Sequence, residues 1–417
     1  MDNLPPIDGD KVSPPGRTGH IAAAHEKYMY VWGGYRENPG ALTNTYFSGS
    51  ELWVYNCFAE QWVLRSCSNS DFPPGMSGSA AVVIDDDLYL FGGYGYNGEG
   101  CTNKLYKINL ETCTWQHLNP TGLAPSPVDK MVGWQYKGKL YTFGGFGNPD
   151  SAAAYDFQFV FYHLLWRGWT NQFFEYDPQK NQWNRPVCTG NFPSARAAHA
   201  AAVMDGKVYI FGGRHDRFRL NDMHCLDMES MKWSGPLPIE GPIPEGRSWH
   251  SLTALAQRYL ILYGGFSQNN IALSDCWMFD TTKHVWTIIE LPFRKPRVWH
   301  SACLNNFNEV LIYGGCTSNI LDLERTPEQA SDMIIIRITP KSLYRMCVDA
   351  VLAIPALEQY WSTLPLSIQK VLRVRVGFVR SESSYVISQI CRFFLSDAKT
   401  LPPRLQRRFH PFSRRGR

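Results

Sequence analysis

Short apolar runs alternate with glycine-rich turns along most of the chain. Six of the runs end in a Gly-Gly doublet: YMYVWGGY (28–35), DLYLFGGY (87–94), KLYTFGGF (139–146), KVYIFGGR (207–214), YLILYGGF (259–266) and EVLIYGGC (309–316). Runs of this length, rich in Tyr, Val, Ile and Phe, are typical of β-strands. Glycine adopts positive φ without a steric cost, so each doublet predicts a sharp turn at the end of its strand.

Further predicted strands flank each doublet. First strands precede five doublets, at 17–24, 77–83, 195–203, 247–254 and 297–304. Third strands follow all six, at 51–56, 103–109, 171–177, 221–227, 274–280 and 331–338. Five units then end on a tryptophan that we expect to pack between neighbouring units: Trp62, Trp115, Trp183, Trp233 and Trp286.

The doublets recur roughly every 50 to 68 residues, a period that resembles the kelch repeat, in which each repeat is one four-stranded blade of a β-propeller. We therefore expect an all-β, six-bladed kelch propeller over residues 1–339 and a helical segment over 340–373. A basic tail over 374–417 is expected to be poorly ordered. The sixth unit lacks its tryptophan, and we expect a segment within residues 1–12 to supply its outer strand, because a propeller must close to remove its sheet edges.

Charge is distributed unevenly. From Arg373 to the end there are eleven Lys or Arg and two acidic residues, a local charge of +9, which leaves −5 for the rest of a chain whose net charge is +4. This gives no reason to expect nucleic acid at the propeller. The tail is expected to be a solvated end, with contact to RNA, membrane or an acidic protein as the alternative.

Three features suggest the nucleus and cytoplasm. The N-terminal MDNLPPIDGD has no secretory signal pattern, and no apolar run is long enough to span a membrane. The eleven cysteines are an odd number and include no CxxC pair, which argues against disulfides and structural zinc.

One face of the ring is expected to collect the turns after each doublet and the turns before each first strand. These turns carry Tyr35, Tyr94, Phe146, Arg214 and Phe266 together with Lys130, Ser248, Trp249 and Trp299. A longer third unit adds an insert, 157–172, with Trp166, Arg167 and Trp169. Insertions on a propeller often form the binding rim, although a chance lengthening is the alternative.

Arg214, Arg217 and Arg219 lie in one loop of the fourth unit, and Ser248 opens the next unit. Two guanidiniums and a hydroxyl beside aromatic rings would bind a carboxylate. On the residues alone, the alternative is that these arginines pair with Asp216 or Asp222 at the surface. The repeated His20, His199, His250 and His300 are expected to be structural, and we expect no catalytic site, metal or cofactor, since no nucleophile elbow, phosphate loop or HExxH is present.

Two amphipathic helices are expected after the propeller. The first starts at Thr339-Pro340 with Leu343, Cys347, Ala350 and Val351 on one face. The second starts at Ser362 or Thr363 with Leu364, Ile368 and Leu372 aligned. Both could simply fold back on the propeller. They also resemble the elongin-binding BC-box (Leu343, Cys347, Val351) and the cullin-2 box (Leu364, Pro365, Ile368).

Residues 17–372 resemble the branch of kelch proteins that act as substrate receptors of elongin–cullin ubiquitin ligases, on segments such as VWGGY (31–35), GRSWHSLT (246–253) and KPRVWH (295–300). The resemblance implies a non-catalytic receptor for protein C-terminal tails that end in glycine, usually diglycine, with elongin B/C and cullin-2 as partners. It implies that Arg214, Arg219 and Ser248 hold the terminal carboxylate and that Lys130, Trp169, Trp249 and Tyr35 wall the pocket. Phe146 replaces a tyrosine of that branch. The alternatives are a kelch scaffold that binds a folded partner, and a metalloenzyme.

Overall fold

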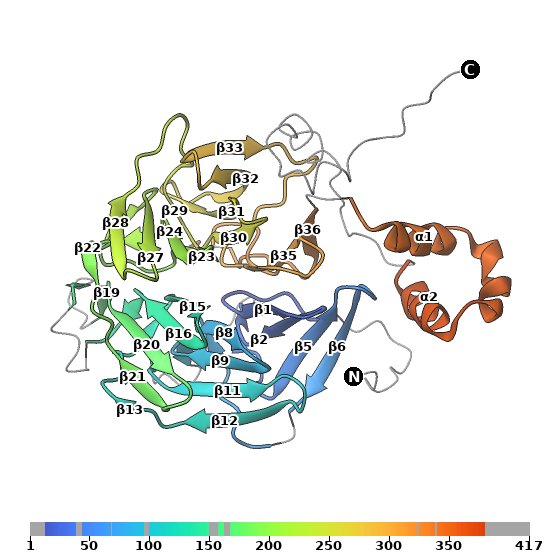
Figure 1. Cartoon of the computed structure of the whole chain (residues 1–417), viewed down its shortest axis with the longest axis horizontal. Coiled ribbons are helices and arrows are strands. Elements are labelled where there is room, and N and C mark those ends of the chain that lie inside the picture. The colour runs from blue at the N-terminus through green and yellow to red at the C-terminus, as the bar shows by residue number, and fades with distance from the viewer. Residues whose placement is uncertain are drawn as a thin grey trace.

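The computed structural model describes residues 13–38, 44–67, 69–95, 100–149, 157–161, 167–322, 325–337 and 340–379. These residues form six blade sheets arranged around a central axis, four smaller sheets, and a helical segment outside the ring beside blade 1 (Figure 1). This arrangement is the six-bladed, all-β propeller that the repeat predicts.

In each blade the repeated strands run antiparallel, and the first of them lies nearest the axis (Figure 1). Blade 1 contains β1 (Ile21–His25), β2 (Tyr28–Trp32), β5 (Glu51–Asn56) and β6 (Gln61–Ser66). Blade 2 contains β8 (Ala80–Ile84), β9 (Asp87–Phe91), β11 (Leu105–Asn109) and β12 (Thr114–Leu118). Blade 3 contains β15 (Val132–Tyr136), β16 (Lys139–Phe143), β20 (Phe173–Asp177) and β21 (Gln182–Asn184). The β15 strand was not among the strands expected from the sequence.

The remaining blades repeat the pattern. Blade 4 contains β23 (Ala200–Met204), β24 (Lys207–Phe211), β27 (Met223–Asp227) and β28 (Lys232–Pro236). Blade 5 contains β30 (Ser251–Leu255), β31 (Tyr259–Ser267), β32 (Ala272–Asp280) and β33 (Val285–Ile289). Blade 6 contains β34 (Ser301–Leu304), β35 (Glu309–Tyr313) and β36 (Met333–Arg337). The outer edges of blades 3 and 4 are extended by short parallel strands, β13 (Thr121–Gly122) and β22 (Thr189–Asn191).

The five repeated tryptophans pack in the seams between blades, as expected. Each ring contacts the aromatic residue that precedes the glycine doublet of the blade before it. The pairs, with their ring-centroid distances, are Trp115 on Trp32 (5.5 Å), Trp183 on Phe91 (4.9 Å), Trp233 on Phe143 (5.3 Å) and Trp286 on Phe211 (5.1 Å). Trp62 of blade 1 packs on Tyr313 of blade 6 at 5.1 Å, so the same contact closes the ring.

The glycine doublets join each blade to the next through the backbone. The second glycine of each doublet donates its N–H to a carbonyl of the following blade, as Gly213 does to Arg247 at 2.8 Å. In blade 6, Gly315 donates to Arg17 of blade 1 at 2.8 Å, which completes the circle. Gly213 has φ +95°, and a Cβ there would lie 2.7 Å from the Cβ of His199. Both the conformation and the close approach therefore require glycine.

Residues near the N-terminus bind blade 6. The hydroxyl of Tyr313 donates to the carbonyl of Pro14 at 2.7 Å, and the N–H of Gly19 donates to Trp299 at 3.1 Å. The outer strand expected within residues 1–12 lies outside the described residues.

The helical segment forms, but its helices start later than expected. Helix α1 (Leu343–Leu352) begins after Ser342, whose hydroxyl accepts the N–H of Arg345, so a start at Thr339-Pro340 is wrong. A 3₁₀-helix, η2 (Pro355–Thr363), follows and buries Trp361 against α1 and α2. Because η2 occupies Ser362 and Thr363, α2 (Leu366–Val379) starts after Pro365 and continues past residue 373.

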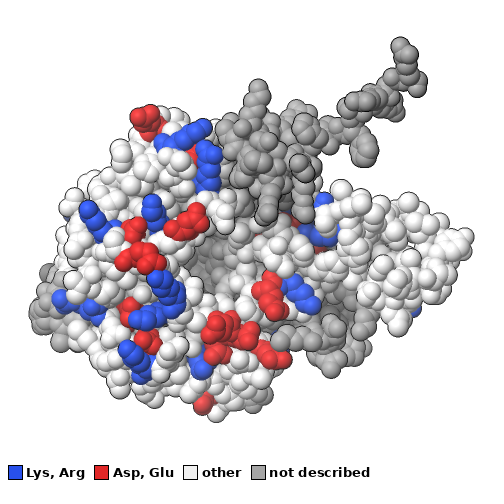
Figure 2. Space-filling model, in the orientation of Figure 1, with Lys and Arg blue, Asp and Glu red and all other residues white. Residues whose placement is uncertain are grey.

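Charges of both signs lie close together around a central hollow on the face that Figure 2 shows. Within single blades, ion pairs join charges of opposite sign, as in Lys107–Asp87 at 2.8 Å and Arg258–Asp280 at 2.6 Å. No described helix has both the length and the apolar composition that a membrane crossing requires.

Four histidines form part of the interior. Each is buried and makes an edge-on ring contact, as His199 does with Phe143 at 5.7 Å. Burial, with a smaller effect of nearby Arg196, lowers the pKa of His199 to about 3, and burial likewise lowers the pKa of His300 to about 3. These rings are therefore neutral parts of the blade structure.

We expect mild acid to destabilise the propeller. An unfolded histidine binds a proton below about pH 6.5, whereas the buried rings stay neutral, so stability is lost as the pH falls below that value. Each such histidine contributes up to about 1.4 kcal/mol per pH unit to the loss. Urea unfolding at pH 7.5, 6 and 5 measures the slope, and His199→Gln should reduce it. A free energy of unfolding that stays constant over this range would contradict the assignment.

Candidate functional site

One mouth of the ring is built from two residues of each blade. The residue after each doublet pairs through a β-bridge with a residue just before the first strand of the same blade. In four blades this second residue lies two positions before the repeated histidine. Thus Arg214 pairs with Ala197, Phe146 with Asp129 and Phe266 with Ser248. This pairing brings the post-doublet loops and the starts of the first strands to one face, as the sequence predicts.

A closed circle of backbone hydrogen bonds surrounds this mouth. Its members are six residues in left-handed conformation, with φ between 55° and 68°: Gly19, Gly78, Lys130, Ala198, Trp249 and Trp299. Each N–H donates to the carbonyl of the member in the preceding blade, over 2.7 to 3.1 Å. The circle pairs the backbone N–H and carbonyl groups at the mouth. It also fixes the positions from which the side chains of Lys130, Trp249 and Trp299 project. Non-glycine residues rarely adopt left-handed φ, so the sequence did not predict this conformation at Lys130, Ala198, Trp249 and Trp299.

A pocket of about 240 Å³ opens on the circle. Its lining residues are Lys130, Phe146, Trp169, Ala197, Ala198, Arg214, Ser248 and Trp249. Six of the eight expected site residues are in this lining. Ala197 and Ala198 are additions that sequence reasoning missed, because small apolar residues carry no chemical signal.

The other two expected residues lie beside the pocket. Arg219 touches the lining through Ser248, since its Nε donates to the Ser248 hydroxyl over 3.2 Å. Tyr35 is buried against Trp299, with 5.9 Å between the ring centroids, and is not in the pocket lining. The structure therefore brings Arg219 into the site and leaves Tyr35 outside the lining.

Two guanidiniums lie side by side at the pocket. The short strands β25 (Arg214–His215) and β26 (Phe218–Arg219) pair Arg214 directly with Arg219. Arg214 lies over the ring of Trp169 at 5.5 Å, and Arg219 lies over Phe266 at 4.6 Å. Burial and the adjacent charge of Arg214 lower the pKa of Arg219 to about 10.

Neither guanidinium has a carboxylate partner among the described residues. The Nε of Arg214 donates to the backbone carbonyl of Asp216 at 2.8 Å and not to its carboxylate. The carboxylate of Asp222 is held at 2.8 Å by buried Arg196. The alternative of surface pairing with Asp216 or Asp222 is therefore wrong, and an anion in the pocket would relieve the repulsion between two adjacent cations.

Lys130 is already paired within the mouth. Its ammonium contacts the carboxylate of buried Asp129 and lies 5.1 Å from the centroid of the Trp299 ring. Lys130 therefore forms a wall whose charge is offset by Asp129, and the arginine pair has no such carboxylate partner among the described residues.

The blade 3 insert supplies another wall. Strand β19 (Gly168–Thr170) pairs with β17 (Phe146–Gly147), which places Trp169 edge-on against Phe146 at 5.1 Å. Arg167 lies over the Phe146 ring at 5.1 Å. Trp166 lies outside the described residues.

The expected partner-binding residues divide into two groups. On α1, the Leu343 side chain is 72% exposed, and Cys347 is exposed as well. Val351, Leu364 and Ile368 are half-buried against a small core of the helical segment itself. Pro365 accepts the N–H groups of Ile368 and Gln369 through its carbonyl and so starts α2. The alternative that the helices fold back on the propeller holds in part, since the start of α1 contacts blades 6 and 1 and α2 also lies against β6 of blade 1.

Comparisons with known proteins agree with this architecture. The model of the KLHDC2/KLHL20/DRC7 Kelch-repeats domain matches residues 19–265 and 166–315. Kelch domain-containing protein 2 of Bos taurus is 37% identical over 376 residues, which cover 87% of this chain and 91% of that protein. Kelch domain-containing protein 1 of Homo sapiens is 37% identical over 347 residues, which cover 80% and 84%.

Solved structures show the same fold. The structure of YjhT superposes with a TM-score of 0.56 at 19% identity, over 78% of this chain and 95% of that one. At that identity the likeness concerns the fold alone. The repeat, the blade architecture and the coverage of these relatives together show that the chain belongs to the kelch-repeat family of kelch domain-containing proteins 1 and 2.

Proposed function

We propose that this chain is the non-catalytic substrate receptor of an elongin–cullin-2 ubiquitin ligase of the nucleus and cytoplasm, and that its pocket binds protein C-terminal tails ending in glycine. The observation that carries the pocket assignment is the adjacent Arg214 and Arg219, without a carboxylate partner among the described residues, beside the Ser248 hydroxyl. Planar guanidiniums bind a carboxylate through paired charge-assisted hydrogen bonds.

A chain end is the carboxylate that fits best. It ends the chain, so it can enter a pocket this small without a continuing backbone beyond it. An internal segment would cover the arginines without supplying an anion, and such unpaired buried charge is costly. The receptor thereby distinguishes chain ends from internal sequence.

The walls favour glycine at the last position. Trp169 and Trp249 flank the pocket, and Ala197 and Ala198 lie in its lining. Side chains on the last residues of a ligand would meet these rigid surfaces, so selectivity comes from steric exclusion. Phe146 offers the ligand a ring face and no hydroxyl.

Exposed apolar residues of α1 support the adaptor role. Leu343 and Cys347 lie one helical turn apart on the solvent side, where an amphipathic helix can enter a partner's groove. In this account the partner complex performs the ubiquitin chemistry and the chain performs recognition.

Titration calorimetry with a peptide series tests the pocket. Peptides that differ only in the last residue should bind in the order Gly, Ala, Leu, with a loss of about tenfold or more at each step as strain or exclusion accumulates. Equal affinities across the series would contradict a glycine pocket. A kelch scaffold without a ligase would instead bind a folded partner and show no affinity for any of these tails.

A further inference from the structure

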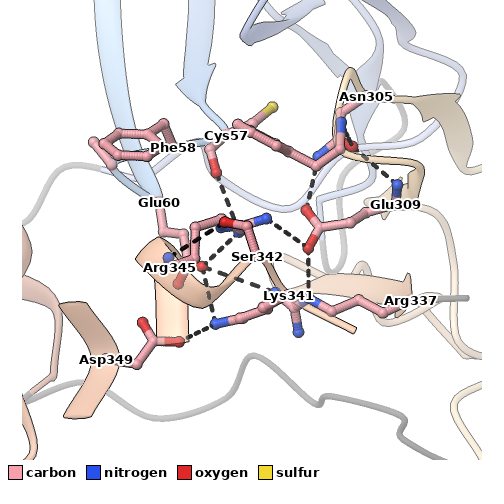
Figure 3. Close-up of polar contacts among 12 residues, drawn as sticks. Cys57, Phe58, Glu60, Asn305, Glu309, Arg337, Lys341, Ser342, Arg345 and Asp349 are labelled. Atoms are coloured by element: carbon pink, nitrogen blue, oxygen red, sulfur yellow. Dashed lines mark hydrogen bonds and ion pairs between the residues drawn. The ribbon is translucent and has the colours of Figure 1, made fainter. Parts of the chain in front are cut away.

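The first turn of α1 is anchored in the seam where blade 6 meets blade 1 (Figure 3). The guanidinium of Arg345 donates to the carboxylate of Glu309 at 2.9 Å and to that of Glu60 at 3.0 Å. Glu309 begins β35 of blade 6, and Glu60 lies in the turn before β6 of blade 1. One side chain of the helix thus holds both sides of the seam.

The charges around Arg345 balance within a buried cluster. Arg337 pairs with Glu309 at 2.6 Å, and Lys341 pairs with Asp349 at 2.5 Å and with Glu60 at 3.5 Å. Arg345 is 3% exposed. Burial alone would lower the pKa of Arg345, but Glu309 and Glu60 outweigh it and raise that pKa. Arg345 is therefore charged, and removing one member of the cluster leaves an opposite charge without its partner.

Apolar contacts surround the ion pairs. Tyr344 stacks on Phe58 of blade 1 with centroids 5.5 Å apart, and the Arg345 guanidinium lies 4.6 Å from the centroid of Phe307 of blade 6. Ser342 caps the helix by accepting the Arg345 N–H at 3.3 Å. The helix is thus held by directional bonds at its start, in addition to packing.

The anchor also sets which side of α1 faces outward. Arg345 and Val348 are the buried residues of the helix, and Leu343, Met346 and Cys347 are exposed. Purely apolar packing tolerates rotation and sliding, whereas buried paired charges permit one register. The seam lies at the ends of the strands opposite the arginine pocket, since Glu60 lies in a turn of the other face and Glu309 directly follows one.

We propose that Arg345 is a positioning residue that locks α1 across the closing seam of the propeller and so holds the exposed Leu343–Cys347 face at a fixed place relative to the pocket. The consequence for a partner rests on the proposed function, but the lock itself does not. The same side chain then both bridges the blades that close the ring and positions the helix face that a partner would bind.

Hydrogen exchange of the full-length protein tests the lock. Arg345→Met keeps the length and helix propensity of the side chain but removes its charge, and amide protection over residues 343–352 should fall about tenfold or more. Arg345→Lys, which keeps a charge, should restore part of that protection. Unchanged protection in Arg345→Met would overturn the proposal.

A variant on the propeller side separates the lock from a general folding defect. Glu60→Gln removes one negative charge and should release the same amides, while the double variant Arg345→Met/Glu60→Gln should lose less protection than the sum of the two single variants. Strict additivity would show that the two residues act independently and would overturn the lock.

Two binding measurements distinguish this proposal from the adaptor role. Arg345→Met should lower the affinity for purified elongin B/C about 5- to 20-fold and leave the affinity for a glycine-ended peptide unchanged. If the wild-type protein does not bind elongin but the exchange result holds, the adaptor role fails and the lock stands. If elongin binds both proteins equally while α1 is released, positioning is overturned.

Discussion

Replacing Ser248 with glutamate is expected to abolish binding of a glycine-ended peptide, with a loss of about 100-fold or more. Ser248 receives a hydrogen bond from the Nε of Arg219 and lines the pocket. A glutamate there places a carboxylate against Arg219 and Arg214, where it takes the ligand's position and repels the ligand's own carboxylate. The loss corresponds to two charge-assisted hydrogen bonds of about 1.5–3 kcal/mol each. Fluorescence polarisation with a labelled peptide measures it.

Arg219→Ala should also weaken binding of the glycine-ended peptide, and it has a closely matched control in Arg217→Ala. It removes one of the two adjacent guanidiniums and should weaken binding by about 10- to 100-fold. Arg217 lies in the same loop and is exposed, so Arg217→Ala makes the same change in net charge without touching the pocket. A thermal unfolding midpoint equal to that of the wild type in all three variants would show that the propeller is intact. Undiminished affinity in Ser248→Glu and Arg219→Ala would remove the pocket assignment.

The second large effect concerns α1. The double variant Leu343→Ala/Cys347→Phe should end copurification with elongin, because it removes the most exposed apolar side chain of the helix and adds bulk one turn later. Neither residue packs on the propeller core, so stability should change little.

Ile354→Ala is the matched control for the adaptor prediction. Ile354 is also an exposed apolar residue of the helical segment, but it lies outside α1. Quantitative mass spectrometry of the captured complexes should show elongin and cullin-2 with the wild type and with Ile354→Ala only. Continued capture of elongin by the Leu343/Cys347 variant would retire the adaptor role.

The sequence predicts the propeller well because each blade repeats one set of local rules. The doublet ends the second strand, and the tryptophan fills the seam, so both signals report packing that recurs five or six times. Blade 3 shows where such reasoning stops: β15 (VGWQY) has neither the histidine of four other first strands nor the Ala80-Ala81 pair of blade 2, so it gave no repeat signal.

The ends of the helices could not be predicted for a different reason. Local capping rules favour Thr339-Pro340, but the anchoring of Arg345 between Glu60 and Glu309 places the start at Ser342. Similarly, burial of Trp361 draws residues 355–363 into a 3₁₀-helix, which delays α2. Contacts between segments far apart in the chain decide both cases.

The sequence predicted which polar and charged residues form the site, but it did not predict how the backbone orients the residues around them. Arg214, Arg219 and Ser248 carry chemistry that a reader of the sequence can recognise, and the doublet places them on one face. The circle of left-handed residues that orients Lys130 and Trp249 arises from bonds between blades, which leave no mark in a linear pattern.

The dissociation constants of one glycine-ended peptide with a free carboxyl terminus and of the same peptide with a terminal amide test the central idea most directly. The amide keeps the shape of the chain end and removes its negative charge. If the arginine pair receives a chain terminus, the free acid binds at least about 100-fold more tightly than the amide. Equal binding of the two peptides would contradict the account.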